Sequence, residues 1–267
     1  MRAIAYVNPR AETAASLFPA ANPLLDRLSR MEPGKAQPAG WSGVLKKSAV
    51  LFLATLSGLA LEARFRLLPA SVGTGAFGPA QFLAITLLLT LPFPLSRLNR
   101  FLPAAAGLYC FGMGLAVSWL ARSMPAWQGA ILEAAVLILA AMLALMAVYF
   151  VGVQQLSATK RGVLTGFVAL CVAGVMLNLC RAVPGLTMAA DFLRETPALN
   201  LPAAGAFLLL AVALISADFA AARRMSRSLP REREWEAAFC LIFSMVWLFM
   251  KGFTLAARSK NERSEIK

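Results

Sequence analysis

The sequence has no histidine among its 267 residues. Without an imidazole, the chain cannot build Ser-His-Asp or Cys-His catalytic sites, zinc sites of the HExxH type or histidine-ligated haem. The cysteines form no CxxC pair and lie inside or at the end of apolar runs, where a thiol behaves as a small buried hydrophobe. They are Cys110, Cys171, Cys180 and Cys240. We therefore predict a protein that is not an enzyme, with no catalytic residues, no cofactor and no metal site.

Charged residues are scarce as well. They make up 15% of the chain, whereas a typical soluble domain has about 25%. Hydrophobic residues reach 59%, and the mean hydropathy is +0.68. So much apolar surface cannot all be buried in a small globule, so it must face lipid, where an α-helix pairs its own backbone N–H and C=O groups. The composition therefore predicts an all-α protein, a polytopic bundle of transmembrane helices.

The charges that are present are mainly basic, with 26 Lys and Arg residues against 13 Asp and Glu residues and a net charge of +13. Most of the basic residues lie in the tails and between apolar runs, which is typical of topology signals and of contacts with lipid head groups. We expect the lipid bilayer, and no nucleic acid, as a partner. No cleavable signal peptide is evident, so we expect the N-terminal tail to remain in the cytosol.

Seven apolar stretches approach the length of about 20 residues that crosses the hydrocarbon core. They are Ser48–Ala63, Gly78–Leu95, Phe101–Leu120, Gly129–Val151, Gly162–Cys180, Leu199–Ala217 (extending to Ala222 if the helix continues) and Ala237–Ala257. We therefore expect a polar cytoplasmic N-terminal tail over residues 1–44, a seven-helix transmembrane domain over 45–257 and a short polar C-terminal tail over 258–267. Both tails are expected to be mobile.

The basic residues also predict the orientation of the spans, because cytoplasmic loops are enriched in Lys and Arg. With a cytoplasmic N-terminus, more than half of these residues fall inside, including the cluster between Arg223 and Arg233. Seven spans then place the C-terminus outside, whereas six or eight spans would place it inside.

Small residues predict where helix backbones approach one another, since they let membrane helices pack closely. Gly162 and Gly166 form a GxxxG pattern in the fifth stretch. The third stretch carries several more small residues, which are Ala104, Gly107, Gly112 and Gly114. These positions are compatible with a compact bundle.

Charged residues at lipid depth are the candidate functional residues, because each costs about 2.5–3.5 kcal/mol at the centre of a membrane helix. Asp218 ends the sixth stretch, just before Arg223 and Arg224. It is either an interfacial carboxylate paired with those arginines or an ion or proton ligand that faces the bundle interior. Glu133 follows Trp127, an expected interface anchor, and its simplest role is that of an interfacial carboxylate.

Lys251 interrupts the seventh stretch. It follows Ala237 by 14 residues, or about 21 Å of helix, so its backbone would lie about 9 Å short of the far interface of a core about 30 Å thick. Its side chain can therefore snorkel to the interface or pair with a carboxylate inside the bundle. The segment from Arg231 to Glu236 mixes charges of both signs, and we expect it to be a solvated turn that leads into this span.

Short segments along the chain carry a family resemblance. They are Asn22–Leu28, Gly43–Ser48, Ala140–Leu145, Lys160–Asn178, Asp218–Phe219, Glu234–Phe239 and Val246–Phe249. Together they resemble the Bax inhibitor-1/YccA-like family, in particular its bacterial branch with a polar N-terminal tail. The resemblance implies a seven-helix bundle with the last helix near the centre, located in the bacterial cytoplasmic membrane. It also implies links to calcium or proton leak, to suppression of stress and cell death in eukaryotes and to modulation of a membrane-bound protease in bacteria.

The resemblance further implies a sensor made of two acidic residues, on the sixth and seventh helices, that share a proton. Such a pair has a raised apparent pKa, because two close carboxyl groups do not both ionise easily. Asp218 matches the position on the sixth helix, but Lys251 stands where relatives carry Asp or Glu on the seventh. A neutral Asp–Lys pair has no shared proton to lose, and a cation repels calcium, so we expect the calcium and pH response to be missing.

Three functions remain open from the sequence. The leading one is modulation of ion leak or membrane stress by the bundle, with Asp218, Lys251 and Glu133 as candidate ion-pathway or sensor residues. The second is an interaction protein that regulates a membrane protease or another membrane complex through its tail and lateral helix faces. The third is a small-molecule exporter with six or eight spans, which would show internal repeats that are not evident here.

Overall fold

The computed structural model describes residues 22–29, 39–68, 79–98, 101–124, 128–151, 158–182, 200–226 and 229–265. Its elements in these ranges are all helices, as predicted from the composition. They are α2 (Pro23–Ser29), α3 (Trp41–Phe65), α4 (Pro79–Thr90), α5 (Pro92–Leu95), α6 (Leu102–Ser123), α7 (Gln128–Phe150), α8 (Ala158–Ala182), α10 (Asn200–Ser226), the 3-10 turn η3 (Arg231–Arg233) and α11 (Glu234–Glu265).

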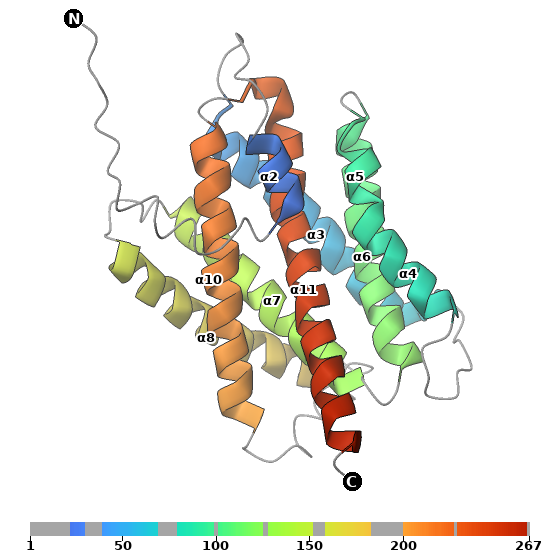
Figure 1. Ribbon diagram of the computed structural model, residues 1–267. Coiled ribbons are helices and arrows are strands. Elements are labelled where there is room, and N and C mark those ends of the chain that lie inside the picture. Colours follow the sequence, from blue (N-terminus) through green and yellow to red (C-terminus); the bar gives the residue numbers. More distant parts are fainter. Residues whose placement is uncertain are drawn as a thin grey trace, which may run out of the picture.

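The helices run back and forth along one bundle (Figure 1). With α4 and α5 counted as one pass, the long helices make the seven passes that the apolar stretches predicted. Three described helices are long and apolar enough to cross a membrane, namely Trp41–Phe65, Leu102–Ser123 and Gly205–Ser226. Shorter apolar helices cover Ala80–Leu95, Ala134–Phe150 and Gly162–Met176. A polytopic membrane bundle is therefore the fold of this chain.

The bundle has two ends that differ in composition. We call one the α2 end, because it contains α2, the starts of α3 and α11 and the end of α10 (Figure 1). The basic residues Lys46, Arg224 and Arg231 lie there and are exposed. We call the opposite one the far end, where α3 and α6 both terminate.

The second pass is broken between α4 and α5 because of proline. Pro92 has no N–H to donate to the Leu88 carbonyl one turn earlier, so that carbonyl loses its helical partner. The hydroxyl of Tyr109 in α6 donates to the Leu88 carbonyl instead, at 2.6 Å. The Tyr109 ring also packs edge-on against Phe239 of α11, with ring centroids 5.4 Å apart. The broken pass is thereby tied to both α6 and α11.

The closest approach of two helices occurs between α3 and α6. A Cβ atom on Gly58 would overlap the Phe111 carbonyl oxygen, and one on Gly114 would overlap the Thr55 carbonyl oxygen. The two backbones therefore touch where each helix lacks a side chain. Gly114 was among the small residues singled out in the sequence, whereas its partner Gly58 was not.

The GxxxG pattern at Gly162 and Gly166 does not mark a comparable contact. A Cβ atom on Gly162 would meet no atom within 4 Å, and one on Gly166 would lie 3.4 Å from the Leu209 side chain, an ordinary contact. Gly107 and Gly112 of α6 also face open space. Spacing alone cannot distinguish a glycine in a helix contact from one that faces outward.

Helix α11 occupies the middle of the bundle, as the family resemblance implied. It packs against α2, α3, α4, α6, α7 and α10. The side chains from Ala237 to Phe243 are at most 1% exposed. The expectation of a solvated turn before this helix is wrong for its last residues, because Glu234 and Glu236 are only 5% and 6% exposed. The start of α11 is covered by α2 and α3, which a local pattern of charges cannot reveal.

Part of the expected N-terminal tail belongs to the bundle. Leu24, Leu25 and Leu28 of α2 are each 2% exposed, and α2 packs between α10 and α11 (Figure 1). The expectation of a mobile tail therefore does not hold for α2. Helix α3 begins at Trp41 and α11 ends at Glu265, so both helices extend past the span limits expected from hydropathy.

Candidate functional site

Asp218 is buried inside the bundle. It lies on α10, eight residues before the helix ends at Ser226, which is about 12 Å along the helix axis. Its exposure is 5%, and it is close enough to the Cys240 thiol of α11 for its charge to act on that group. Of the two roles considered from the sequence, this burial favours a carboxylate that faces the bundle interior.

A second buried carboxylate, Glu236, lies one helical turn before Cys240 on α11 and on the same face. It is 6% exposed and precedes the apolar span. Burial raises the pKa of Glu236 above its usual value, and the positive charges of Arg233 and Arg27 offset part of that rise. From the sequence, Glu236 is recognised only as a charged residue at a span end and is not among the candidate ion-pathway residues.

Helix α2 covers this region through Asn22, a residue with no exposed surface. The Asn22 amide donates to the Cys240 carbonyl at 2.5 Å and to Ser244 Oγ at 2.9 Å. Its Oδ1 accepts the Leu24 N–H at 2.9 Å and so caps the start of α2. An Asn directly before a Pro is a helix-start signal, and this signal could have revealed α2 in the sequence.

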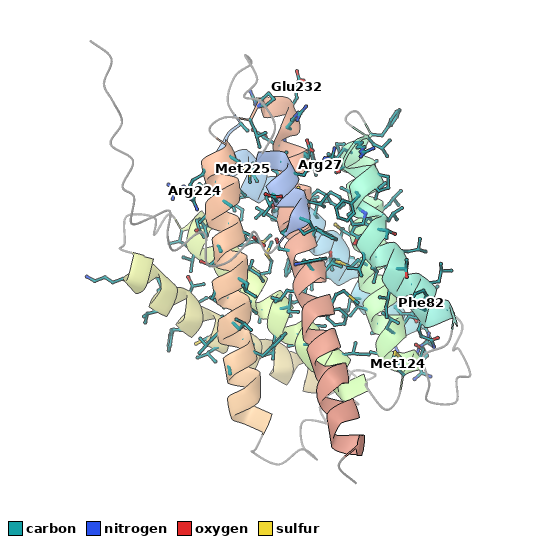
Figure 2. All side chains as sticks on the ribbon, in the orientation of Figure 1. Arg27, Phe82, Met124, Arg224, Met225 and Glu232 are labelled. Carbon is teal, nitrogen blue, oxygen red and sulfur yellow. The ribbon has the colours of Figure 1, made fainter. Side chains whose placement is uncertain are left out.

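Arg27 of α2 places a positive charge at the same end (Figure 2). Its Nη1 donates to Ser96 Oγ, just after α5, at 3.2 Å. Its charge also acts on Glu236 and on Cys240. Helix α2 therefore connects the end of α5 with α11 and supplies a cation beside a buried carboxylate.

Glu234, the first residue of α11, holds the start of α3. Its Oε1 accepts the Gly40 N–H at 2.9 Å, and its Oε2 accepts a bond from Lys47 Nζ at 2.6 Å. A Cβ atom on Gly43 would collide with this carboxylate, so the absence of a side chain there makes room for it. The Lys47 ammonium also lies 5.4 Å from the ring centroid of Trp235.

This geometry explains the titration of Glu234. Burial by itself raises the pKa of a carboxyl group. Here the bonds from Lys47 and the Gly40 N–H, with the nearby charges of Lys47 and Arg231, outweigh burial and lower the pKa of Glu234 below its usual value of 4.5. Glu234 therefore acts as an ionised cap on the start of α3, where N–H groups lack helical partners.

The far end contains a second carboxylate with similar partners. Glu62 of α3 has a side chain with no exposed surface and forms an ion pair with Arg122 of α6. It also accepts the Leu68 N–H at 3.0 Å, and Arg122 donates to the Leu68 carbonyl at 2.5 Å. Arg66 adopts the left-handed conformation at the end of α3, with φ of 52°. The pair closes the turn after α3 and joins it to α6.

The backbones of Glu133 and Lys251 lie in α7 and α11, while their side chains lie outside the described residues. Helix α11 is continuous, so Lys251 follows Cys240 by 11 residues, or about 16 Å along the axis. Because Asp218 lies near Cys240, this separation argues against the direct Asp218–Lys251 pair considered from the sequence.

The described residues offer few places for a ligand. They contain no group of three or more His, Cys, Asp and Glu side chains that could hold a metal ion. A cavity of about 40 Å³ lies among α3, α4, α6, α7 and α11, and all of its exposed lining is apolar. An apolar cavity that binds benzene has about 150 Å³, so this smaller one does not suit an organic substrate of that size.

Comparison with known proteins gives one match that covers nearly the whole chain. The family described as Bax inhibitor 1 like matches residues 22–260. The matched range begins at Asn22 and therefore includes α2 as well as the long helices. No curated protein and no solved structure matches the chain.

Proposed function

Because the chain belongs to the Bax inhibitor 1 like family, we propose that it is a multi-pass membrane protein that modulates the leak of cations, protons or calcium, across a membrane. The observation that carries this proposal is the burial of Asp218, at 5% exposure, in a helix long and apolar enough to span. A carboxylate costs several kcal/mol at such a depth and is typical of ion and proton pathways.

The pathway would run along the contact of α10 and α11. Asp218 and Glu236 both act electrostatically on Cys240, so both carboxylates lie within electrostatic range of one position of α11. Each can attract a cation or carry a proton, and the passage from one to the other follows the α11 axis. Glu236 lies nearer the α2 end and would be the first carboxylate met from that side.

The shared-proton sensor of the family is not part of the proposal for this chain. Lys251 stands where relatives carry an acidic residue, and the length of α11 separates it from Asp218. Glu133 stays a candidate pathway residue on α7. Pathway control in this chain would therefore rest on Asp218 and Glu236 rather than on an Asp–Asp pair.

The proposal is tested with purified protein in liposomes, by measuring proton and calcium flux at acidic and neutral pH. We expect flux through the native protein and its loss in Asp218→Asn. The matched control is Glu232→Gln, because Glu232 is exposed at the same end of the bundle (Figure 2). Equal flux in the native protein and in Asp218→Asn, or no flux in either, would overturn the proposal.

Lys251→Asp adds a test of the sensor position. If this variant gains a pH-dependent calcium leak that the native protein lacks, the lysine has replaced a working carboxylate. If the native protein already conducts calcium in a pH-dependent way, Lys251 is a snorkelling residue and the sensor lies elsewhere.

The proposed location is the bacterial cytoplasmic membrane with a cytoplasmic N-terminus. The exposed basic residues at the α2 end, such as Lys46, Arg224 and Arg231, support that orientation, because cytoplasmic flanks are enriched in Lys and Arg. Addition of a cysteine before residue 20, followed by labelling with a membrane-impermeant thiol reagent in intact cells, tests this proposal. Labelling from outside would contradict it.

Regulation of a membrane protease or another membrane complex is the second candidate function. Exposed apolar side chains on α8, including Val163, Phe167 and Leu170, favour a lateral contact within the membrane. A pull-down from a chain that lacks residues 2–20 separates this role from leak, since leak requires only the bundle. The deletion must stop before Asn22, because α2 is part of the fold.

A further inference from the structure

The sequence of helix α2 is typical of a short amphipathic helix that packs its apolar face on a neighbouring surface. Its apolar residues Leu24, Leu25 and Leu28 lie on one face, by helical spacing, and all are 2% exposed. That face packs against both α10 and α11. The helix has only 7 residues, far fewer than the 12–15 or so that make even a marginal isolated helix. Its structure therefore depends on the groove it occupies.

The polar contacts of Asn22 can be broken without leaving α11 with unpaired groups. In an α-helix the Cys240 carbonyl accepts the N–H of residue 244, and it also accepts a bond from the Ser244 hydroxyl at 3.4 Å. The bonds from Asn22 are additional to these. Undocking of α2 would leave α11 internally satisfied, which distinguishes this contact from a permanent structural tie.

The docked helix contacts α11 at Cys240, one turn after Glu236, and its Arg27 acts on the Glu236 carboxylate. Arg27 acts on Glu236 and Cys240, and Asn22 binds the Cys240 carbonyl directly. Among the described residues, Asp218, Arg233 and Glu236 also act on the region of Glu236 and Cys240, and Lys47 and Arg231 act on Glu234 at the start of α11. A guanidinium at this position repels cations and neutralises a carboxylate that would otherwise attract them.

We propose that α2 is an autoinhibitory plug, which Asn22 holds on Cys240 and Ser244 and which closes the α2 end of the bundle over Glu236 and Asp218 until it undocks. The inhibitory role of α2 rests on the proposed leak function. Protection of Glu236 from solvent by α2 is a separate property, and it can be measured without any flux.

The test compares the native full-length chain with Asn22→Ala. Both are treated with a water-soluble carbodiimide and an amine, and the modified carboxyl groups are mapped by peptide mass spectrometry. We expect Glu236 to react about tenfold faster in Asn22→Ala, the change that one or two hydrogen bonds make in a docking equilibrium. Glu232, which is exposed, should react equally in both proteins, and Glu62, which is buried at the far end, should stay protected in both.

Unchanged protection of Glu236 in Asn22→Ala, with Glu62 still protected, would overturn the plug. If Glu62 also becomes reactive, the variant has lost its fold. The same labelling experiment on Ser244→Ala then tests the plug. That variant removes one of the two acceptors of Asn22 and leaves the chain of α2 intact. It should give a smaller increase at Glu236, and no increase would overturn the plug.

Flux measurements separate failure of the plug from failure of the leak function. With both proposals correct, Asn22→Ala raises cation flux about tenfold, and Asp218→Asn on that background abolishes the rise. If Glu236 becomes reactive in Asn22→Ala while neither this variant nor the native protein conducts, the leak function is wrong, and α2 still covers Glu236 in the native protein. If the native protein conducts through Asp218 and Asn22→Ala conducts no faster, α2 is not inhibitory and the plug is overturned.

Discussion

At each end of α3, a buried carboxylate forms an ion pair with one basic side chain and accepts a hydrogen bond from one backbone N–H. The two carboxylates come from different parts of the chain. Glu62 belongs to α3 and binds Arg122, 60 residues further on. Glu234 belongs to α11 and reaches Lys47 across 187 residues. The ion pair at the far end therefore links two helices of the first half of the chain. The ion pair at the α2 end links α3 with the last helix, α11.

The surroundings of the two ion pairs also differ in the kind of contact that they contain. Between the middle of the bundle and the far end, α3 and α6 touch through their backbones at Gly58 and Gly114, a contact that a side chain at either glycine would disrupt. At the α2 end, Glu234 binds Lys47 and the Gly40 N–H, and the short helix α2 is held on α11 by hydrogen bonds from Asn22. From this difference we expect the backbone contact between α3 and α6 to tolerate substitution less than the side-chain contacts at the α2 end.

The largest effect is expected where backbones touch. Gly114→Val places a side chain against the Thr55 carbonyl and should destabilise the bundle by about 3 kcal/mol or more, because neither helix can shift without losing the α3–α6 contact. Gly112→Val is the matched control, since its Cβ would meet no atom within 4 Å. Thermal unfolding of the detergent-solubilised protein, followed by size-exclusion chromatography, measures both. Equal losses in the two variants would contradict this expectation.

A smaller effect is expected from the buried ion pair. Arg122→Met leaves the Glu62 carboxylate buried without its cation and should cost about 3 kcal/mol or less, since the Arg122 side chain is partly exposed and water can reach its place. The double variant Glu62→Gln with Arg122→Met should recover part of the loss. The same unfolding assay gives the coupling between the two residues. Additive losses would show that the pair does not hold α3 to α6.

The smallest effect is expected at Glu234. Glu234→Gln keeps the shape of the side chain but removes the charge-assisted bonds to Lys47 and Gly40, at a cost of about 1.5 kcal/mol at neutral pH. The pKa of Glu234 is lowered in the folded protein, so this stabilisation is present above pH of about 4.5 and is lost as pH falls through the lowered pKa.

The native protein should therefore lose thermal stability more steeply on acidification than Glu234→Gln, and the difference in Tm between them should shrink as the pH falls below about 4.5. Parallel pH profiles would show that Glu234 is not an ionised cap. Glu232→Gln, at an exposed position, should follow the native profile.

Much of the architecture could be predicted because it depends on local composition. Apolar stretches of sufficient length predicted the seven passes, and the proline at residue 92 explains why one pass is broken. Asp218 is buried in the structure, and its role as an ion or proton ligand stays a prediction. By contrast, Asn22, Glu234 and Glu236 were missed as structural residues, since their partners lie in distant helices and nothing in their neighbourhood signals burial.

Two local patterns illustrate how little a segment reveals about its neighbours. The mixed charges before Ala237 are typical of a solvated turn, yet Glu234 and Glu236 are buried because α2 and α3 pack over them. The GxxxG pattern at Gly162 and Gly166 is typical of a close helix contact, yet the close contact is made by Gly58 and Gly114. A local sequence pattern indicates which structures a segment can form. The helices that pack against the segment determine which of these structures it adopts.

Composition and segment length were enough to predict an all-α membrane bundle, because long apolar stretches with few charges pair their backbone groups most simply as helices in lipid. The sequence also determined the family, through segments spread from Asn22 to Phe249. The cap that Glu234 forms on α3, the contact of Asn22 with α11 across 218 residues and the effect of the Asp218 charge on Cys240 became evident from the packing of the helices alone. These contacts depend on which helices become neighbours, and that choice is made by the packing of the whole bundle rather than by any one segment.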